Sequence, residues 1–133
     1  MQSSSTEITP YGIEQVMALK VNDTFVDNRK VCIIDTGYDR DHLDLPSGDT
    51  ITGDSFGPES WYQDVNRHGT HVAGTIAALG GNGRGVVGVN RNGKLKLHIL
   101  RFLDDGGYAY TSDLVRAVSF LKTVISRGCE NSK

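Results

Sequence analysis

Two residues, Asp35 and His68, have the side chains and the setting for acid–base chemistry. Asp35 directly follows a short apolar run at residues 30–34, and His68 opens the stretch H-G-T-H-V-A-G-T-I-A at residues 68–77. A carboxylate that accepts a hydrogen bond from an imidazole orients the ring, and the pair makes up the acid and base of a nucleophilic triad. We also expect the positive end of a helix dipole to keep the imidazole neutral and available as a base.

The elements that would position these residues alternate between strand and helix along the chain. Residues 30–34 form a continuous apolar run typical of a parallel strand buried on both faces, and residues 94–103 predict a second such strand. Apolar residues at helical spacing predict helices over residues 68–79 and 112–127. This order predicts an α/β fold with a parallel sheet flanked by helices. Because ligands sit beyond the carboxyl ends of such strands, the carboxylate and the imidazole are expected to meet above one sheet edge.

Each predicted helix has an apolar face that we expect to pack on the sheet. Four residues share the face of the first helix: His68, Val72, Ile76 and Leu79. Six residues share the inner face of the second, which is expected to close at residues 127–128: Leu114, Ala117, Val118, Leu121, Val124 and Ile125. A further short helix is predicted over residues 10–20 and a flexible lead over residues 1–9. Residues 38–66 are long for a structureless connection and therefore predict a short strand or a functional segment.

The composition is that of one soluble globular domain and excludes several classes of function. The chain has 133 residues and a net charge of −2, so it lacks the basic surface of a nucleic-acid-binding protein. No apolar run reaches the roughly 18 residues of a membrane span, and the polar first seven residues are no secretory signal. Two cysteines are too few for a disulfide scaffold, and Cys32 within an apolar run is expected to be a buried free thiol.

Three other chemistries fit parts of the sequence less completely. His68 and His71 have the spacing of a metal-binding pair, but the glutamate of an H-E-x-x-H motif is missing. Residues 33–37 (I-I-D-T-G) resemble the active-site signature of aspartic proteases, whose mostly stranded fold leaves the two predicted helices unexplained. Residues 80–85 are rich in glycine like a phosphate-binding loop, yet they follow a helix and lack the G-K-S/T ending.

The two motifs together resemble the subtilisin-like serine proteases. Residues 33–39 (I-I-D-T-G-Y-D) match the first motif of that family, and residues 68–77 match its longer and more specific second motif. Supporting matches lie at residues 10–16, 42–45 and 85–89, so the resemblance runs nearly the whole chain. It implies a subtilisin-like fold of which this chain holds about the first half, the N-terminal portion of the catalytic domain.

The resemblance implies roles for particular residues. Asp35 would be the orienting acid and His68 the general base, in a family whose triad order is aspartate, histidine, serine. Gly106 and Gly107 resemble the edge segment that pairs with the backbone of a protein or peptide substrate by β-augmentation.

A structural calcium ion is also implied by the resemblance. The matching side chains are Glu7, Asp44 and Asn82, with backbone carbonyl groups near Arg84 and Val86. Oxygen ligands on a glycine-bent loop suit a hard cation.

The nucleophile of the family has no counterpart in the sequence. The family carries its serine in a Gly-Thr-Ser-x-Ala turn and an oxyanion asparagine further downstream, and neither is found in these residues. The chain alone is therefore expected to be an inactive fragment of a serine endopeptidase, which the family resemblance implies is secreted and made with a prosegment. The alternative is a truncated product that acts as a non-catalytic binding module.

Overall fold

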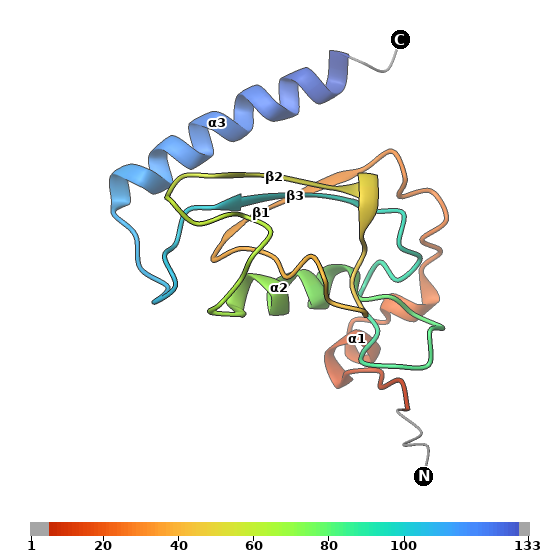
Figure 1. Ribbon diagram of the computed structural model, residues 1–133. Coiled ribbons are helices and arrows are strands. Elements are labelled where there is room, and N and C mark those ends of the chain that lie inside the picture. Colours follow the sequence, from red (N-terminus) through yellow and green to blue (C-terminus); the bar gives the residue numbers. More distant parts are fainter. Residues whose placement is uncertain (1–5, 131–133) are drawn as a thin grey trace.

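The predicted alternation of strands and helices is present in the computed structural model, which describes the backbone of residues 6–130 and the side chains of residues 6–124 (Figure 1). Three strands, β1 (Lys30–Asp35), β2 (Ile51–Ser55) and β3 (Lys96–Arg101), form one parallel sheet in the order β1-β3-β2. Every residue of β3 after Lys96 is buried, as expected for a central parallel strand covered on both faces. The short η2 turn (Gly48–Thr50) leads into β2, which confirms the strand expected within residues 38–66.

Helix α2 (His68–Ala77) covers one face of this sheet (Figure 1). The core between them joins Ile33, Leu97 and Ile99 of the strands to Ala73 and Ala77 of the helix. Alanine side chains are short, so the helix backbone lies close to the strands.

The residues predicted to form the apolar face of α2 are not the ones that are buried against the sheet. The buried positions of the helix are Gly69, Thr70, Ala73 and Ala77, whereas Val72 and Ile76 are only partly buried. The close approach to the sheet selects small side chains for the buried face, and the larger apolar ones pack at its margin.

Helix α3 (Thr111–Glu130) runs along the opposite face of the sheet, above the strands in Figure 1. Of its predicted inner face Ala117 is fully buried, but the side chains of Leu114 and Val118 stay 42% and 44% exposed. Ile125 lies outside the residues whose side chains are described. The helix also continues through Gly128 instead of ending there, since a helical glycine costs only about 1 kcal/mol relative to alanine.

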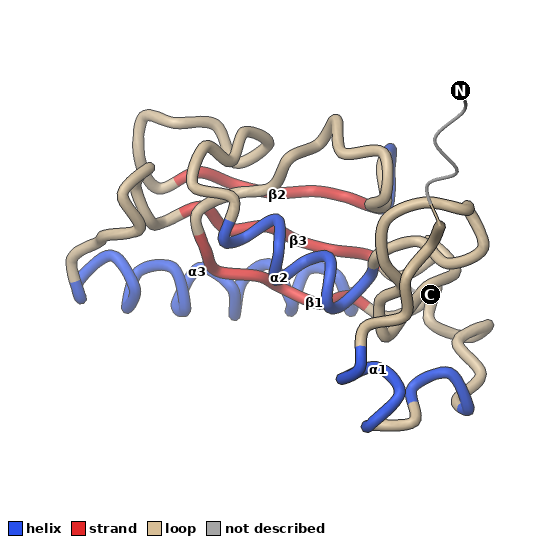
Figure 2. The backbone as a smooth tube through the Cα atoms, turned by 90° about the horizontal axis from the view of Figure 1, so that it is seen from below, coloured by secondary structure: helices blue, strands red, loops and turns tan. Residues whose placement is uncertain are grey.

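The N-terminal segment contains two short helices in place of the single predicted one. These are α1 (Tyr11–Gln15) and the 3-10 turn η1 (Ala18–Lys20), separated by Met17 in a left-handed conformation with φ of 55°. Figure 2 shows α1 to one side of the sheet, away from α3. The flexible lead expected over residues 1–9 is wrong for Ile8, whose N–H donates to Gly85 O at 2.9 Å. Residues 1–5 lie outside the described residues.

Cys32 lies on β1 and is a free thiol, as predicted. It is half-buried rather than buried, because β1 is the edge strand of the described sheet. Burial raises the pKa of this thiol, and the nearby Lys30 opposes that shift. No helix among the described residues is both long and apolar enough to cross a membrane.

Candidate active site

Asp35 and His68, which are 33 residues apart in the sequence, are in direct contact. The Nδ1 atom of His68 lies 2.8 Å from Oδ1 and 3.0 Å from Oδ2 of Asp35. Asp35 ends β1 and its side chain is 11% exposed, while His68 opens α2 and its side chain is 66% exposed. An ionised carboxylate can only accept hydrogen bonds, so Nδ1 carries the proton and Nε2 of the neutral ring is free to act as a base.

The pKa of His68 shifts in the direction opposite to the one expected from the helix dipole. The hydrogen bond to Asp35 and the negative charge of that residue raise the pKa of His68, burial opposes this shift weakly, and Asp64 adds to it. The sequence-based expectation of a ring kept neutral is therefore wrong in direction, because the adjacent carboxylate outweighs the dipole. A general base of this kind gains its neutral form only as the pH rises through the raised pKa.

The end of β1 and the start of α2 approach each other too closely for a side chain at Gly69. A Cβ atom there would lie 2.3 Å from Gly37 O and 3.2 Å from the Cβ atom of Asp35. Gly69 N–H instead donates to the Thr36 hydroxyl at 3.0 Å. The close contact with β1 thus explains why the residue after the histidine is a glycine.

Asp64 is a functional candidate that the sequence analysis missed. Its carboxylate accepts hydrogen bonds from the hydroxyls of Thr36 and Thr70 and from the backbone N–H groups of Arg67 and Thr70. Burial would raise the pKa of Asp64, but these hydrogen bonds outweigh burial and lower it. The signal available in the sequence was an aspartate just ahead of a predicted helix start, a position typical of capping residues.

The predicted substrate-binding glycines lie in a turn after β3 that is tied to the start of α2. Gly106 is exposed, and Gly107 has a φ of 82° and donates its N–H to Asp104 O at 3.0 Å. The Asn66 side chain donates to Asp105 O at 3.0 Å, which links this turn to the residues just before the histidine. The arrangement leaves Gly106 exposed in a turn that is joined to the loop just before His68.

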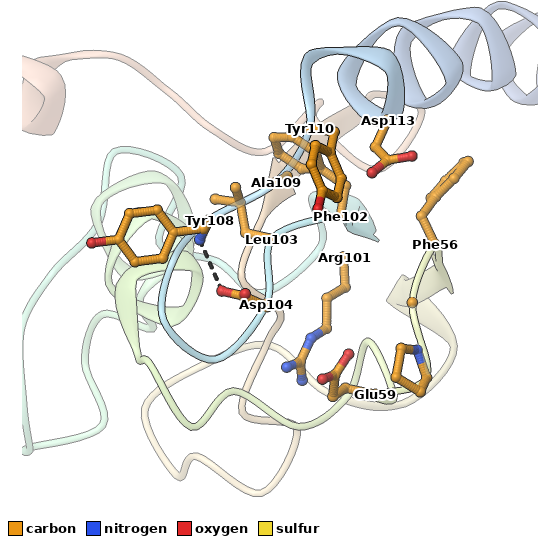
Figure 3. A pocket seen from close by; sticks show the side chains of 12 residues that line it. Phe56, Glu59, Arg101, Phe102, Leu103, Asp104, Tyr108, Ala109, Tyr110 and Asp113 are labelled. Atoms are coloured by element: carbon orange, nitrogen blue, oxygen red, sulfur yellow. Dashed lines mark hydrogen bonds between the residues drawn. The ribbon is translucent and has the colours of Figure 1, made fainter.

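A pocket of about 410 Å³ opens at the carboxyl ends of β2 and β3, beside the start of α3 (Figure 3). Aromatic side chains including Phe56 and Tyr110 line it together with the acidic Glu59. The Arg101 side chain is 3% exposed and donates from Nη1 to Gln63 O at 2.7 Å. Neither member of the acid–base pair lines this pocket. Through its bond to Gln63 O, Arg101 holds the loop that precedes Asp64.

The residues predicted to hold calcium come from the N-terminal arm, the loop after β1 and the loop after α2, and hydrogen bonds join them. The Asp44 carboxylate accepts from Asn82 Nδ2 at 2.7 Å and from Val86 N at 2.8 Å, and Asn82 N donates to Glu7 Oε1 at 3.0 Å. Arg84 N–H caps the Asn82 amide oxygen at 3.0 Å. Asp44 is almost fully buried and makes no ion pair within residues 6–124.

This donor set fits a hard cation in its chemistry. Two carboxylates and an amide oxygen surround a turn at Gly85, where a Cβ atom would lie 2.0 Å from Asp44 Oδ2. Cation binding requires the Asn82 amide to turn, so that its oxygen rather than its nitrogen faces the ion. Among the described residues, no three histidine, cysteine, aspartate or glutamate side chains gather as a metal-binding group, either at His71 or at this loop, whose two carboxylates would need amide and carbonyl oxygens to complete a site.

Known proteins are similar to this chain in sequence and in fold. The model of the subtilase family matches residues 27–127. An intracellular serine protease of Paenibacillus polymyxa is 44% identical over 93 residues, which cover 66% of this chain and 28% of that protein. Subtilisin DY of Bacillus licheniformis is 40% identical over 117 residues, which cover 86% of this chain and 40% of that protein.

A solved structure has the same fold. The crystal structure of the psychrophilic subtilisin-like protease Apa1 from the Antarctic Pseudoalteromonas sp. AS-11 matches with a TM-score of 0.75 and 44% identity, over 86% of this chain and 26% of that chain. The predicted subtilisin-like α/β fold is thereby confirmed as a partial domain, and the chain spans only about a quarter to two-fifths of these relatives. Because the family model matches residues 27–127, well over half of the chain, this chain belongs to the subtilase family.

Proposed function

We propose that this chain supplies the acid and the base of an Asp-His-Ser triad in a serine endopeptidase. The observation that carries the proposal is the contact of His68 Nδ1 with both carboxylate oxygens of Asp35. In this role Asp35 fixes the ring and stabilises the imidazolium that forms when Nε2 takes the proton of a serine hydroxyl attacking a peptide carbonyl. The exposed His68 ring is open to a substrate, and the buried Asp35 is shielded from water.

The nucleophile is proposed to come from outside these 133 residues. No serine hydroxyl within residues 6–124 is hydrogen-bonded to His68, and the sequence contains no Gly-Thr-Ser-x-Ala string. In subtilisin itself, loss of the serine lowers turnover about 10⁶-fold although the oxyanion hole remains. The chain alone is therefore expected to show no measurable hydrolysis of peptides.

The test is to sequence the transcript and genomic DNA beyond the Lys133 codon and to express the whole reading frame. We expect a frame that continues into a Gly-Thr-Ser-x-Ala turn and a product that hydrolyses a protein substrate. His68→Ala and Asp35→Asn variants should then lose that hydrolysis, while Asp49→Asn, at an exposed carboxylate before β2, should keep it. A stop codon at this place in both sequences would contradict the proposal.

A second candidate function, a non-catalytic binding module, is favoured by one surface. An open groove of about 820 Å³ lies between α1 and α2 and is lined by apolar side chains that include Ile13, Val16 and Leu45. If the 133-residue chain is the complete product, this groove is where a polypeptide partner would bind. Cooperative unfolding of the monomeric chain would support this candidate, whereas aggregates that bind a hydrophobic dye would favour the fragment of a protease.

We also propose that the loop around Asp44 binds a structural calcium ion through Glu7, Asp44, Asn82 and the carbonyl groups of Arg84 and Val86. The ion would compensate the buried Asp44 charge and fasten the N-terminal arm to the loop after α2. Calcium at about 100 times its Kd should stabilise the fold by about 2.7 kcal/mol, measured as a rise in Tm over a chelator control. Asp44→Asn should remove the rise, and an equal rise in that variant would contradict the site.

The remaining expectations from the family are kept as proposals. Gly106 and Gly107 would pair with the substrate backbone; the support is that Gly106 is exposed and that Asn66, two residues before His68, is hydrogen-bonded to this turn. A prosegment and secretion are proposed from the family resemblance alone. Since two matched relatives are named as intracellular, detection of the protein in culture medium or in the cell fraction decides the compartment.

A further inference from the structure

The loop ahead of α2 places one carboxylate between the two elements that carry the acid–base pair. Oδ1 of Asp64 accepts from Thr36 Oγ1 at 2.8 Å and from Arg67 N at 2.9 Å. Oδ2 accepts from Thr70 N at 2.8 Å and from Thr70 Oγ1 at 2.5 Å. The four donors come from the end of β1, from the residue before α2 and from the first turn of α2, and together they fix the position of this carboxylate.

The two threonines stand next to the members of the pair. Thr36 directly follows Asp35 at the end of β1, and Thr70 lies two residues after His68 in the first turn of α2. The Thr36 hydroxyl also accepts from Gly69 N, so a continuous chain of hydrogen bonds runs from the helix through Thr36 to the carboxylate.

Helix α2 depends on these outside contacts because it has no cap of its own. Its N-cap residue, Arg67, has a left-handed φ of 71° and makes no side-chain capping bond. The first N–H groups of a helix lack partners within the helix. In α2 those of Gly69 and Thr70 are satisfied by Thr36 and Asp64.

We propose that Asp64 is a positioning residue that sets the contact between Asp35 and His68 by joining Thr36 to Thr70. This inference rests on the proposed function, since it concerns the same acid–base pair. The hydrogen-bond partners of Asp64 are Thr36, Arg67 and Thr70, not Asp35 or His68, so it acts on the pair through the two threonines. Loss of either link is expected to let the start of α2 move relative to β1 and so to lengthen the contact of His68 with Asp35.

A carboxylate near an imidazole also acts through its charge, and the variants must separate the two effects. Thr36→Val is close in shape to the native residue and removes the link while Asp64 keeps its charge. Thr36→Ser keeps the hydroxyl and serves as the conservative rescue. Thr70→Val breaks the other link in the same way, and Asp49→Asn removes an exposed carboxylate far from the pair.

The experiment is an NMR titration of His68 in the product of the whole reading frame and in these variants of it. In the native chain the pKa of His68 is raised, and Asp35→Asn should lower it. We expect Thr36→Val, Thr70→Val and Asp64→Asn each to lower it toward that of a free imidazole, with Thr36→Ser and Asp49→Asn close to native. Far-UV circular dichroism checks that each variant keeps its helices.

The outcomes separate this inference from the proposed function. If Asp64→Asn lowers the pKa of His68 but both valine variants leave it unchanged, Asp64 acts by charge alone and the positioning role is overturned. If none of the three changes it, the role is overturned as well. If Asp35→Asn has no effect, the acid–base pair itself fails, and the positioning role fails with it.

Discussion

The two helices that flank the sheet are held in opposite ways. Helix α2 has ten residues, among them two glycines and four β-branched residues, which are poor helix formers. Its first turn is fixed from outside by Thr36 and Asp64, and its alanines pack directly on the strands. Helix α3 has twenty residues and a clear amphipathic pattern, yet most of its large apolar side chains remain partly exposed.

The difference teaches that an amphipathic pattern and a buried face are separate properties. A ten-residue helix is too short to be stable alone in water, so α2 exists because of its contacts with β1 and the loop before it. Helix α3 is long enough to form from its own sequence; among its described residues only Ala117 is fully buried, while Phe120 packs edge-on against Phe56. His68, the base of the pair, therefore lies on the helix whose position is fixed by the rest of the fold, and Asp35 lies on the adjacent strand β1.

The largest expected effect is the contrast between the packing under α2 and the packing of α3. Ile99 is fully buried among the alanines of α2, so Ile99→Ala should lower the free energy of unfolding by about 2–5 kcal/mol. Val118 of α3 is largely exposed, so Val118→Ala should change it by less than about 0.5 kcal/mol. Urea unfolding of both variants measures the two values, and equal costs would mean that α3 is packed as closely as α2.

A smaller effect is expected at the two glycines of α2, which differ only in their surroundings. A Cβ atom at Gly69 meets Gly37 O at 2.3 Å, so Gly69→Ala should cost about 1–3 kcal/mol by forcing the helix away from β1. A Cβ atom at Gly74 meets only Leu45 Cδ2 at 3.9 Å, so Gly74→Ala should stabilise the helix by about 0.5–1 kcal/mol.

Thermal unfolding of the two alanine variants decides between these expectations. Opposite changes in Tm are the expected result. A loss of stability in both variants would contradict the expectation, because the effect of an added methyl group would then not depend on the close contact at Gly69.

The same contrast explains what the sequence could predict. Asp35 and His68 were found because each lies in a local pattern, a strand end and a helix start. Asp64 was missed because its partners Thr36 and Thr70 belong to different elements, and no local pattern pairs them. Contacts of this kind follow only once the strand and the helix are placed side by side.

The errors in burial have a related cause. Helical periodicity ranks Val72 and Ile76 as the buried stripe of α2, but the short distance to the sheet gives that place to Ala73 and Ala77. In α3 the same periodicity predicted an inner face that packs on the sheet, and only Ala117 among the described residues of that face is fully buried. Periodicity reports which residues share a face; the distance to the neighbouring element decides which of them are buried.

The smallest expected effect is the pH dependence of stability, which should have opposite signs for the histidines near the two helices. His98 on β3 is buried with its Nδ1 2.9 Å from Thr52 Oγ1, and it alternates with Leu97 and Ile99, which face α2, so its side chain points to the α3 side. Burial lowers its pKa, with Asp54 opposing and Lys30 adding to that shift. Below about pH 6.5 the unfolded chain therefore binds a proton that folded His98 does not, and stability falls with the pH.

His68 behaves in the opposite sense. Its folded pKa is raised, so its contribution to stability is present below about pH 6.5 and is lost as the pH rises through the raised value. The contribution is small because the ring is exposed and solvent screens the Asp35 charge. Relative to the native chain, His98→Leu should gain stability on acidification from pH 8 to pH 5 and His68→Gln should lose it. Urea midpoints at several pH values measure both differences. If the stability differences of the two variants change with pH in the same direction, the expected contrast between the two histidines is wrong.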